Sequence, residues 1–143
     1  MMFKQILLPI DLEENELTER AIMVAQDIAE RYESNITVVT VIPDFSMPVV
    51  ASYFPADAVE RARRDACTEI EKLIKARFRD PEAVRCDVGE GSPHKFIVDY
   101  AHDKKIDLIV MPSRGRDISK IFLGSSTTHV VQRAPCSVLV IRP

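Results

Sequence analysis

One stretch of the chain, residues 113–126, combines residue types that bind phosphate. Gly124 precedes Ser125 and Ser126 where a helix is expected to begin, and Gly115 lies earlier in the same stretch. Glycine lets main-chain amides approach an oxyanion, and a helix start adds unpaired amides and a positive dipole end. The stretch also holds three cations, Arg114, Arg116 and Lys120, against one acid, Asp117. This pattern predicts a phosphate-binding loop, with an ordinary surface loop before a serine-capped helix as the alternative.

An acid, Asp11, follows the first apolar segment of the chain. A carboxylate there can accept hydrogen bonds from ribose hydroxyls or an adenine amino group, or help to hold a hydrated cation. The alternative is an acid that caps the next helix or lies in a solvated loop. In open α/β sheets, ligands bind beyond the carboxyl ends of the strands, where the strand order reverses. We therefore expect Asp11 and the phosphate-binding loop at the same edge of a sheet.

The histidines and cysteines do not indicate catalysis or metal binding. His94, His102 and His129 lie far apart in the sequence, and none has a cysteine or an acid at metal-ligand spacing. An odd number of cysteines at wide spacing, Cys67, Cys86 and Cys136, favours a reducing compartment and packed or idle thiols. The glycine patterns of dinucleotide sites and P-loops are absent from the sequence. We therefore expect no catalytic residue and no metal site.

The elements that would position these residues are short strands and amphipathic helices. Four apolar runs, 6–8, 36–42, 108–111 and 137–141, are apolar at nearly every position, which is typical of strands covered on both faces. A fifth, 84–88, alternates apolar with charged residues, as a half-exposed edge strand does. Helical spacing covers 15–32, 57–78, a segment that starts at Ser92-Pro93, and 125–132. Strands that alternate with helices predict an α/β fold with right-handed crossovers.

A long connection, residues 43–56, contains three prolines, several large apolar side chains and one charge, Asp44. Long loops of this kind are often functional. One interpretation is a lid over a ligand or a subunit contact. The other is a segment that packs down over the sheet edge.

Length and composition limit the classes of function. With 143 residues, 46% of them hydrophobic, the chain suits a single domain, residues 1–143. A net charge of -3 argues against a sequence-independent binder of nucleic acid or of an anionic membrane. No apolar run approaches the roughly 18 residues of a membrane-spanning helix, and the N-terminus does not read as a signal peptide. We therefore expect a cytoplasmic protein without nucleic-acid or membrane partners.

Several segments together resemble the universal stress protein family, in particular its small bacterial, single-domain, ATP-binding type. They are Ile6-Leu7-Leu8-Pro9-Ile10-Asp11, Val39-Thr40-Val41-Ile42-Pro43, Gly89-Glu90-Gly91-Ser92-Pro93, Leu108-Ile109-Val110-Met111, Gly124-Ser125 and Cys136-Ser137-Val138-Leu139-Val140. The resemblance implies an open, Rossmann-like sheet of five parallel strands in the order 3-2-1-4-5, with helices on both faces. It also implies a homodimer through the last strand, with a tetramer as a further step.

The resemblance further implies a regulatory stress-response protein that binds ATP or AMP, with or without Mg²⁺, and hydrolyses ATP slowly or not at all. The chain departs from the family's phosphate motif in two places: Pro112 replaces the first glycine, and only eight residues separate Gly115 from Gly124. An interaction protein of the same fold that has lost its nucleotide site is therefore the alternative. The implied nucleotide-binding residues are Pro9, Ile10, Asp11, Val41, Met111, Arg114, Gly115, Arg116, Gly124, Ser125 and Ser126.

Overall fold

Strands and helices alternate along the chain, as the sequence predicts. The computed structural model describes residues 2–12, 16–42, 57–113 and 124–143. The strands are β1 (Gln5–Pro9), β2 (Asn35–Ile42), β3 (Val84–Glu90), β4 (Leu108–Pro112) and β5 (Ser137–Ile141). The helices are α1 (Glu16–Tyr32), α3 (Ala58–Arg77), α4 (Pro93–Asp103) and α5 (Ser125–Arg133), with a short 3-10 turn, η1 (Pro81–Ala83), that the sequence analysis did not anticipate.

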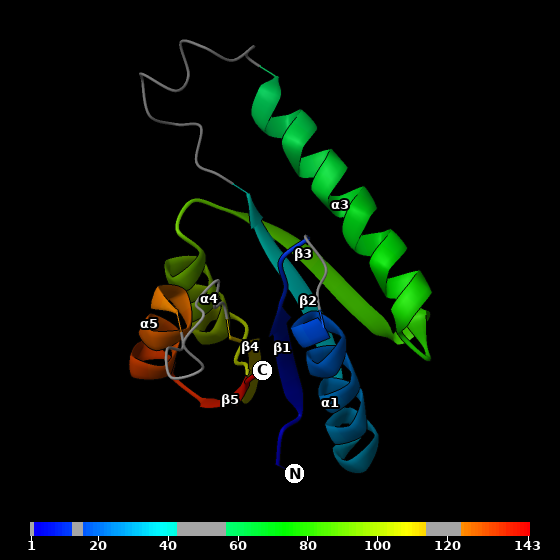
Figure 1. The fold of residues 1–143 in the computed structure, drawn as a ribbon, viewed down its shortest axis with the longest axis vertical. Coiled ribbons are helices and arrows are strands. Elements are labelled where there is room, and N and C mark those ends of the chain that lie inside the picture. Colours follow the sequence, from blue (N-terminus) through cyan, green and yellow to red (C-terminus); the bar gives the residue numbers. More distant parts are fainter. Residues whose placement is uncertain (1, 13–15, 43–56, 114–123) are drawn as a thin grey trace.

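The strands form one parallel sheet in the order β3-β2-β1-β4-β5, which confirms the predicted fold (Figure 1). The order reverses between β1 and β4, because β1 leads through α1 to β2 on one side while β4 lies on the other. The carboxyl ends of β1 and β4 are therefore the expected ligand position.

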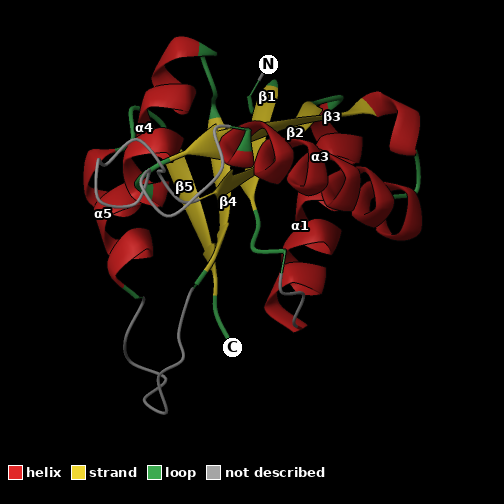
Figure 2. Cartoon of the chain, turned by 90° about the horizontal axis from the view of Figure 1, so that it is seen from above, coloured by secondary structure: helices red, strands yellow, loops and turns green. Residues whose placement is uncertain are grey.

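Each face of the sheet has its own apolar core, so both faces are covered (Figure 2). α1 and α3 pack on one face against alternate strand residues such as Ile6, Leu8 and Val38. α4 and α5 pack on the other face around Leu7, Val39 and their neighbours. The double coverage explains why the central strands are apolar at nearly every position, whereas β3 alternates at the edge.

Two prolines limit the pairing of β1 with β4 at their carboxyl ends. The paired positions are Ile6 with Leu108 and Leu7 with Ile109. Continued, this register would place Pro9 beside Met111 and Ile10 beside Pro112. Because proline has no amide hydrogen, neither Pro9 nor Pro112 can donate a hydrogen bond across this seam. The sequence thus weakens the ladder at the point where the strand order reverses.

The helices of the described segments show no membrane-spanning character. None of them combines the length with the apolar composition that crossing a bilayer requires.

Candidate functional site at the carboxyl edge of the sheet

The described part of the predicted nucleotide site lies on three strands and one helix start. Asp11 follows β1 and is partly exposed, Val41 is near the end of β2, and Met111 is buried near the end of β4. Gly124 precedes α5, which starts with Ser125. Residues 114–123 and 43–56 lie outside the described residues, so the predicted roles of Arg114, Gly115 and Arg116, and of the long connection, stay predictions.

Gly124 adopts a backbone conformation that favours glycine. Its φ is 85° and its ψ is 153°, and it occupies the N-cap position of α5. The Gly124 carbonyl accepts hydrogen bonds from the Thr128 amide at 3.0 Å and from the Thr128 hydroxyl at 2.8 Å. A side chain at this position would be strained. The positive φ of Gly124 therefore gives a geometric reason for a glycine at this position.

The first turn of α5 presents donors that the helix itself does not use. The first amides of an α-helix have no intrahelical acceptor, and the N-cap residue of α5, Gly124, has no side chain that could cap them. In the same turn the Thr127 side chain is fully buried, and its Oγ1 has no hydrogen-bond partner in the described structure. An unsatisfied buried hydroxyl is costly, so this turn has polar capacity that a bound oxyanion or water could satisfy.

The main chain at the end of β2 is the second polar feature of this edge. The Ile10 amide donates to the Val39 carbonyl at 2.8 Å, which extends the β1–β2 ladder by one rung. A regular parallel ladder would next join the Val41 amide to the Ile10 carbonyl. Instead the buried Thr40 hydroxyl donates to that carbonyl at 3.0 Å, and within the described residues the Val41 amide makes no main-chain bond to it.

Alternation along the strands sorts the predicted residues by face. Val41 follows Val39 by two positions, so its side chain lies on the same face of the sheet as those of Val39 and Met111, the face that α5 covers. Ile10 belongs to the other core, under α1 and α3. The predicted set is therefore split: Val41, Met111 and the start of α5 share one face, and the Ile10 side chain does not.

A pair of histidines that the sequence did not bring together lies beside this helix start. The rings of His94 in α4 and His129 in α5 stack, with centroids 4.3 Å apart and planes inclined by 22°. The ring nitrogen Nδ1 of His129 lies 2.9 Å from the Ser125 carbonyl, and Nδ1 of His94 lies 3.2 Å from the Ser92 hydroxyl. The pKa of His94 is lowered. Burial is the largest cause, and the charges of His129 and Arg133 lower the pKa further.

The start of α4 is itself fixed by glycine. The main chain at Gly89 passes so close to the Phe96 ring that a Cβ at this position would lie 2.4 Å from it. The next turn residue, Gly91, has a φ of 98° and donates its amide to the Ile42 carbonyl at 3.0 Å. Glycines at these positions therefore bring α4, and with it His94, against the end of β3.

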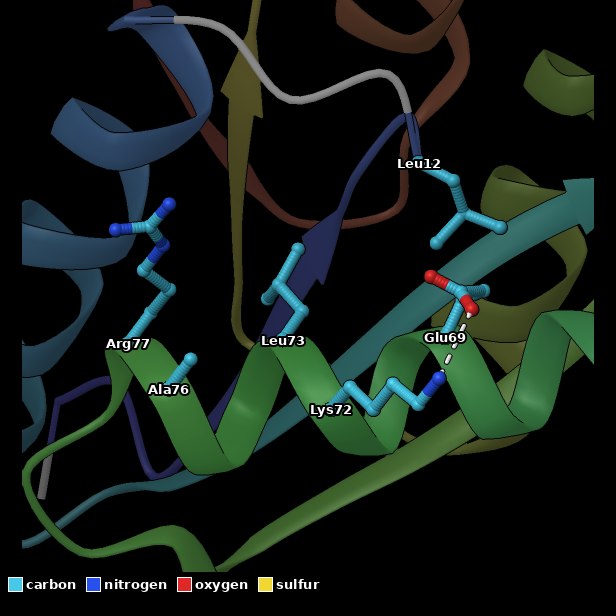
Figure 3. A pocket seen from close by; sticks show the side chains of 6 residues that line it. All are labelled: Leu12, Glu69, Lys72, Leu73, Ala76 and Arg77. Atoms are coloured by element: carbon cyan, nitrogen blue, oxygen red, sulfur yellow. Dashed lines mark ion pairs between the residues drawn. The ribbon is translucent and has the colours of Figure 1, made fainter.

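A cavity of about 400 Å³ lies on the opposite face of the sheet, beside Leu12 (Figure 3). Most of its lining comes from α3. Its charges are already paired: Lys72 lies 3.6 Å from Glu69, and Arg77 lies 3.1 Å from Glu19 of α1. Both cations already have partners. The cavity is therefore a less favourable site for an anionic ligand than the start of α5.

Metal-binding chemistry has no cluster to support it in the described segments. No group of three or more histidine, cysteine, aspartate or glutamate side chains there could hold a metal ion.

Comparison with known proteins places this fold among named relatives. The model of the universal stress protein family matches residues 2–142. Universal stress protein G of Salmonella typhimurium is 29% identical over 144 residues, which cover 99% of this chain and 100% of that protein. Universal stress protein MJ0531 of Methanocaldococcus jannaschii is 30% identical over 146 residues, which cover 99% of this chain and 83% of that protein.

Solved structures agree on the fold. The structure of hypothetical protein MJ0577 superposes with a TM-score of 0.78 at 26% identity, covering 100% of this chain and 98% of that one. A universal stress protein in complex with cAMP has a TM-score of 0.63 at 22% identity, with 99% and 98% covered. One from Archaeoglobus fulgidus in complex with dAMP has a TM-score of 0.63 at 18% identity, with 99% and 100% covered.

These matches extend along nearly the whole chain, and the strand order is the one that the sequence resemblance implied. The chain therefore belongs to the universal stress protein family.

Proposed function

We propose that this protein is a regulatory stress-response protein that binds an adenine nucleotide, ATP in the first place, at the carboxyl edge of β1 and β4. The observation that carries the proposal is the start of α5, where Gly124 has a positive φ and the buried Thr127 hydroxyl lacks a partner in the described structure. Relatives of the same fold solved with cAMP and dAMP support an adenine nucleotide as the ligand class.

Each part of the nucleotide would meet a different part of this edge. The Val41 main chain would bind the adenine edge, with Met111 and Val41 packing on the ring, and the Asp11 carboxylate would accept hydrogen bonds from the ribose. The first amides of α5 and the Ser125 and Ser126 hydroxyls would bind the phosphates. Pro9 would line the seam. The Ile10 amide is bonded to the Val39 carbonyl, so Ile10 would contribute the second lone pair of its carbonyl, which already accepts from the Thr40 hydroxyl.

The basic loop residues would complete the phosphate site. Arg114 and Arg116 supply positive charge next to Gly115, and guanidinium groups form strong charge-assisted hydrogen bonds with phosphate oxygens. A magnesium ion that accompanies ATP would take most of its oxygen ligands from phosphates and water. Pro112 removes one main-chain donor, so we expect the phosphate path here to depend more on α5 and on the arginines.

Regulation without rapid turnover fits the side chains near the phosphate end. His129 is engaged with the Ser125 carbonyl and with the His94 ring, so it positions α5 instead of activating a water molecule. We therefore propose slow or no hydrolysis.

We also propose that the chain is a single domain, that it forms a homodimer through β5 and that it is located in the cytoplasm. Cell fractionation would check the location.

Calorimetry with ATP and adenosine tests the site. In Gly124→Val, a Cβ at a strained position displaces the first amides of α5, and we expect ATP affinity to fall at least about tenfold, with a smaller loss for adenosine. Gly91→Val is the matched control, because it strains another positive-φ glycine outside the phosphate site and should leave the ratio of the two affinities unchanged.

Two results would contradict the proposal. Absence of ATP binding to the unmodified protein at millimolar concentration, together with no nucleotide released on denaturation, would favour the interaction protein with a lost site. Equal ATP affinity in Gly124→Val and in the unmodified protein would show that the phosphates do not bind at the start of α5.

A further inference from the structure

Two cysteines that the sequence predicts to be packed or idle lie on elements that pack together. Cys67 is in α3 and Cys86 is in β3. Both are free, both are partly exposed, and both pack against the apolar core on the α1–α3 face. Cys136 packs against the core on the other face, so the sheet separates it from this pair.

One contact, which we call the anchoring contact, indicates how α3 lies along β3. The Arg63 guanidinium donates to the Val88 carbonyl at 2.7 Å and lies 3.4 Å from the Glu90 carboxylate. A helix in a right-handed crossover runs antiparallel to its strands, so later residues of α3 lie beside earlier residues of β3 (Figure 1).

One turn of α3 is about as long as two residues of β3. Four helical residues rise by about 6 Å, and two strand residues span about 6.6 Å. Cys67 is four residues after Arg63, and Cys86 is two residues before Val88, so the two cysteines lie one turn along from the anchoring contact. Two positions along a strand also preserve the face, which directs Cys86, like the buried Val88, toward α3.

The electrostatics of Cys86 agree with this placement. Its pKa is raised first by burial and then by negative charge on Glu71, Cys67 and Asp87. Glu71 is one further turn along α3 from Cys67, so the α3 residues that act on Cys86 are those that the register predicts. A raised pKa keeps Cys86 protonated at neutral pH and makes it a poor first nucleophile.

We propose that Cys67 and Cys86 form a redox-sensitive dithiol that hydrogen peroxide converts into an intramolecular disulfide between α3 and β3. The Cys67 sulfur attacks one peroxide oxygen, the O–O bond breaks, and the products are a Cys67 sulfenic acid and one water. The Cys86 sulfur then attacks the Cys67 sulfur, the S–O bond breaks, and a second water leaves. Two thiols lose two electrons in total, and the peroxide gains them.

Peptide mapping without reductant reads the product directly. Trypsin places the three cysteines in separate peptides, residues 65–72, 86–95 and 134–143. After treatment of the full chain with a few equivalents of hydrogen peroxide, we expect peptides 65–72 and 86–95 to appear as one linked species about 2 Da lighter than their sum, which separates on reduction. The linked species should be lost in Cys67→Ser and in Cys86→Ser and retained in Cys136→Ser, the matched control.

Closure of the disulfide should also change thermal stability. A cross-link between residues 67 and 86 restricts the unfolded chain, so the oxidised protein should melt roughly 5–10 °C above the reduced one, and reductant should reverse the shift. Cys136→Ser should show the same shift, and Cys67→Ser should not.

The proposal fails if peroxide links peptide 134–143 to either partner, yields mainly dimers joined between chains, or carries both thiols to sulfinic acids without a linked species. A disulfide needs about 4–7 Å between the two Cα atoms. Failure of the link would therefore show that α3 and β3 are held too far apart, and it would leave the proposed nucleotide site unaffected.

Discussion

The stacked imidazoles of His94 and His129 join the first turn of α4 to the second turn of α5. Because α5 begins at the proposed phosphate site, the charge on this pair acts on an element that the site needs. His129 and Arg133 both oppose a proton on His94, and burial opposes it most. The pair is therefore most compatible with the packing of α4 on α5 when His94 is neutral.

Acid should weaken the fold through this pair. The pKa of His94 is lowered from 6.5, so between its folded and unfolded values the unfolded chain binds more protons than the folded chain. The free energy of unfolding then rises with pH through that window and falls as the solution is made more acidic. We expect the Tm to drop from pH 7.5 to pH 5.5 by a smaller amount in His94→Gln than in the unmodified protein.

His102→Gln is the control for this pH dependence. His102 is in the same helix but its side chain is strongly exposed, so His102→Gln removes a histidine of α4 without touching the stacked pair. Identical profiles for His94→Gln and the unmodified protein would mean that the stacked pair carries no proton-linked stability.

The sequence could identify single residues where local chemistry was sufficient, and not where distant packing was needed. A glycine before two serines has a local meaning, and the positive φ of Gly124 fits a position that favours glycine, while its role in binding phosphate stays a prediction. His94 and His129 are far apart in sequence, so only the packing of α4 on α5 brings their rings together. The hydrogen bond from the Thr40 hydroxyl to the Ile10 carbonyl likewise depends on the register of two strands.

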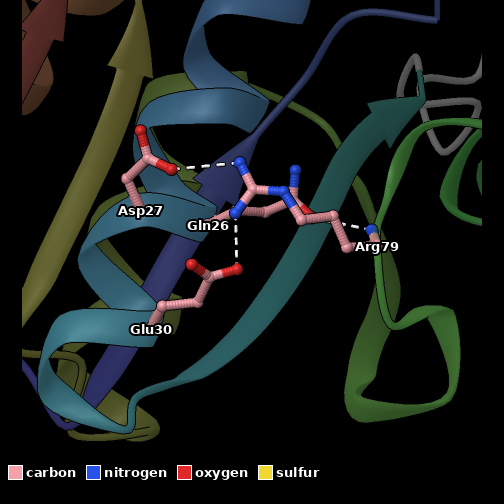
Figure 4. Close-up of polar contacts among 4 residues, drawn as sticks. All are labelled: Gln26, Asp27, Glu30 and Arg79. Atoms are coloured by element: carbon pink, nitrogen blue, oxygen red, sulfur yellow. Dashed lines mark hydrogen bonds and ion pairs between the residues drawn. The ribbon is translucent and has the colours of Figure 1, made fainter.

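Among the elements, α1 and the segment after α3 are joined by a polar contact at Arg79 (Figure 4). The Arg79 amide donates to the side-chain oxygen of Gln26 at 2.8 Å, and Gln26 is buried. The Arg79 guanidinium pairs with Asp27 and Glu30, which raise its pKa, but these groups are exposed. The partly buried hydrogen bond from the Arg79 amide to Gln26 and the exposed ion pairs therefore contribute differently to stability.

Gln26→Ala should destabilise the protein by about 1–3 kcal/mol, because it leaves the partly buried Arg79 amide without its acceptor. Arg79→Ala keeps that main-chain bond and removes only exposed ion pairs, so it should cost less. Urea unfolding of both variants measures the difference. A larger loss in Arg79→Ala than in Gln26→Ala would contradict this division.

Element types were predictable because their patterns arise from burial. Strands covered on both faces are apolar at nearly every position, and the alternation in β3 marked an edge, as found. One short element was not foreseen: η1 was missed because three residues carry no periodicity. The effect of Pro9 and Pro112 on one seam could not be foreseen, because it depends on the register of β1 against β4.

For the whole molecule, the sheet order leaves β5 at an edge. In the described structure β5 pairs only with β4, and exposed apolar side chains lie on it and on the adjacent helix: Leu139 is 37% exposed and Val131 is 46% exposed. An edge strand with unpaired main-chain groups and apolar neighbours is a natural surface for a second copy. A twofold axis beside β5 would join two sheets through identical strands.

In the proposed homodimer, Val140→Glu would place a charge in each half of the β5 contact and bring the two charges together, so the variant should be a monomer. Light scattering after size exclusion should report half the mass of the unmodified protein. Met23→Glu is the control, since it adds the same charge at a position of α1 that is 57% exposed and should leave the mass unchanged. A Val140→Glu protein that keeps the mass of a dimer would place the interface elsewhere. Circular dichroism shows whether the variant is folded. If it is unfolded, Leu139→Glu, at a more exposed position of the same strand, tests the interface instead.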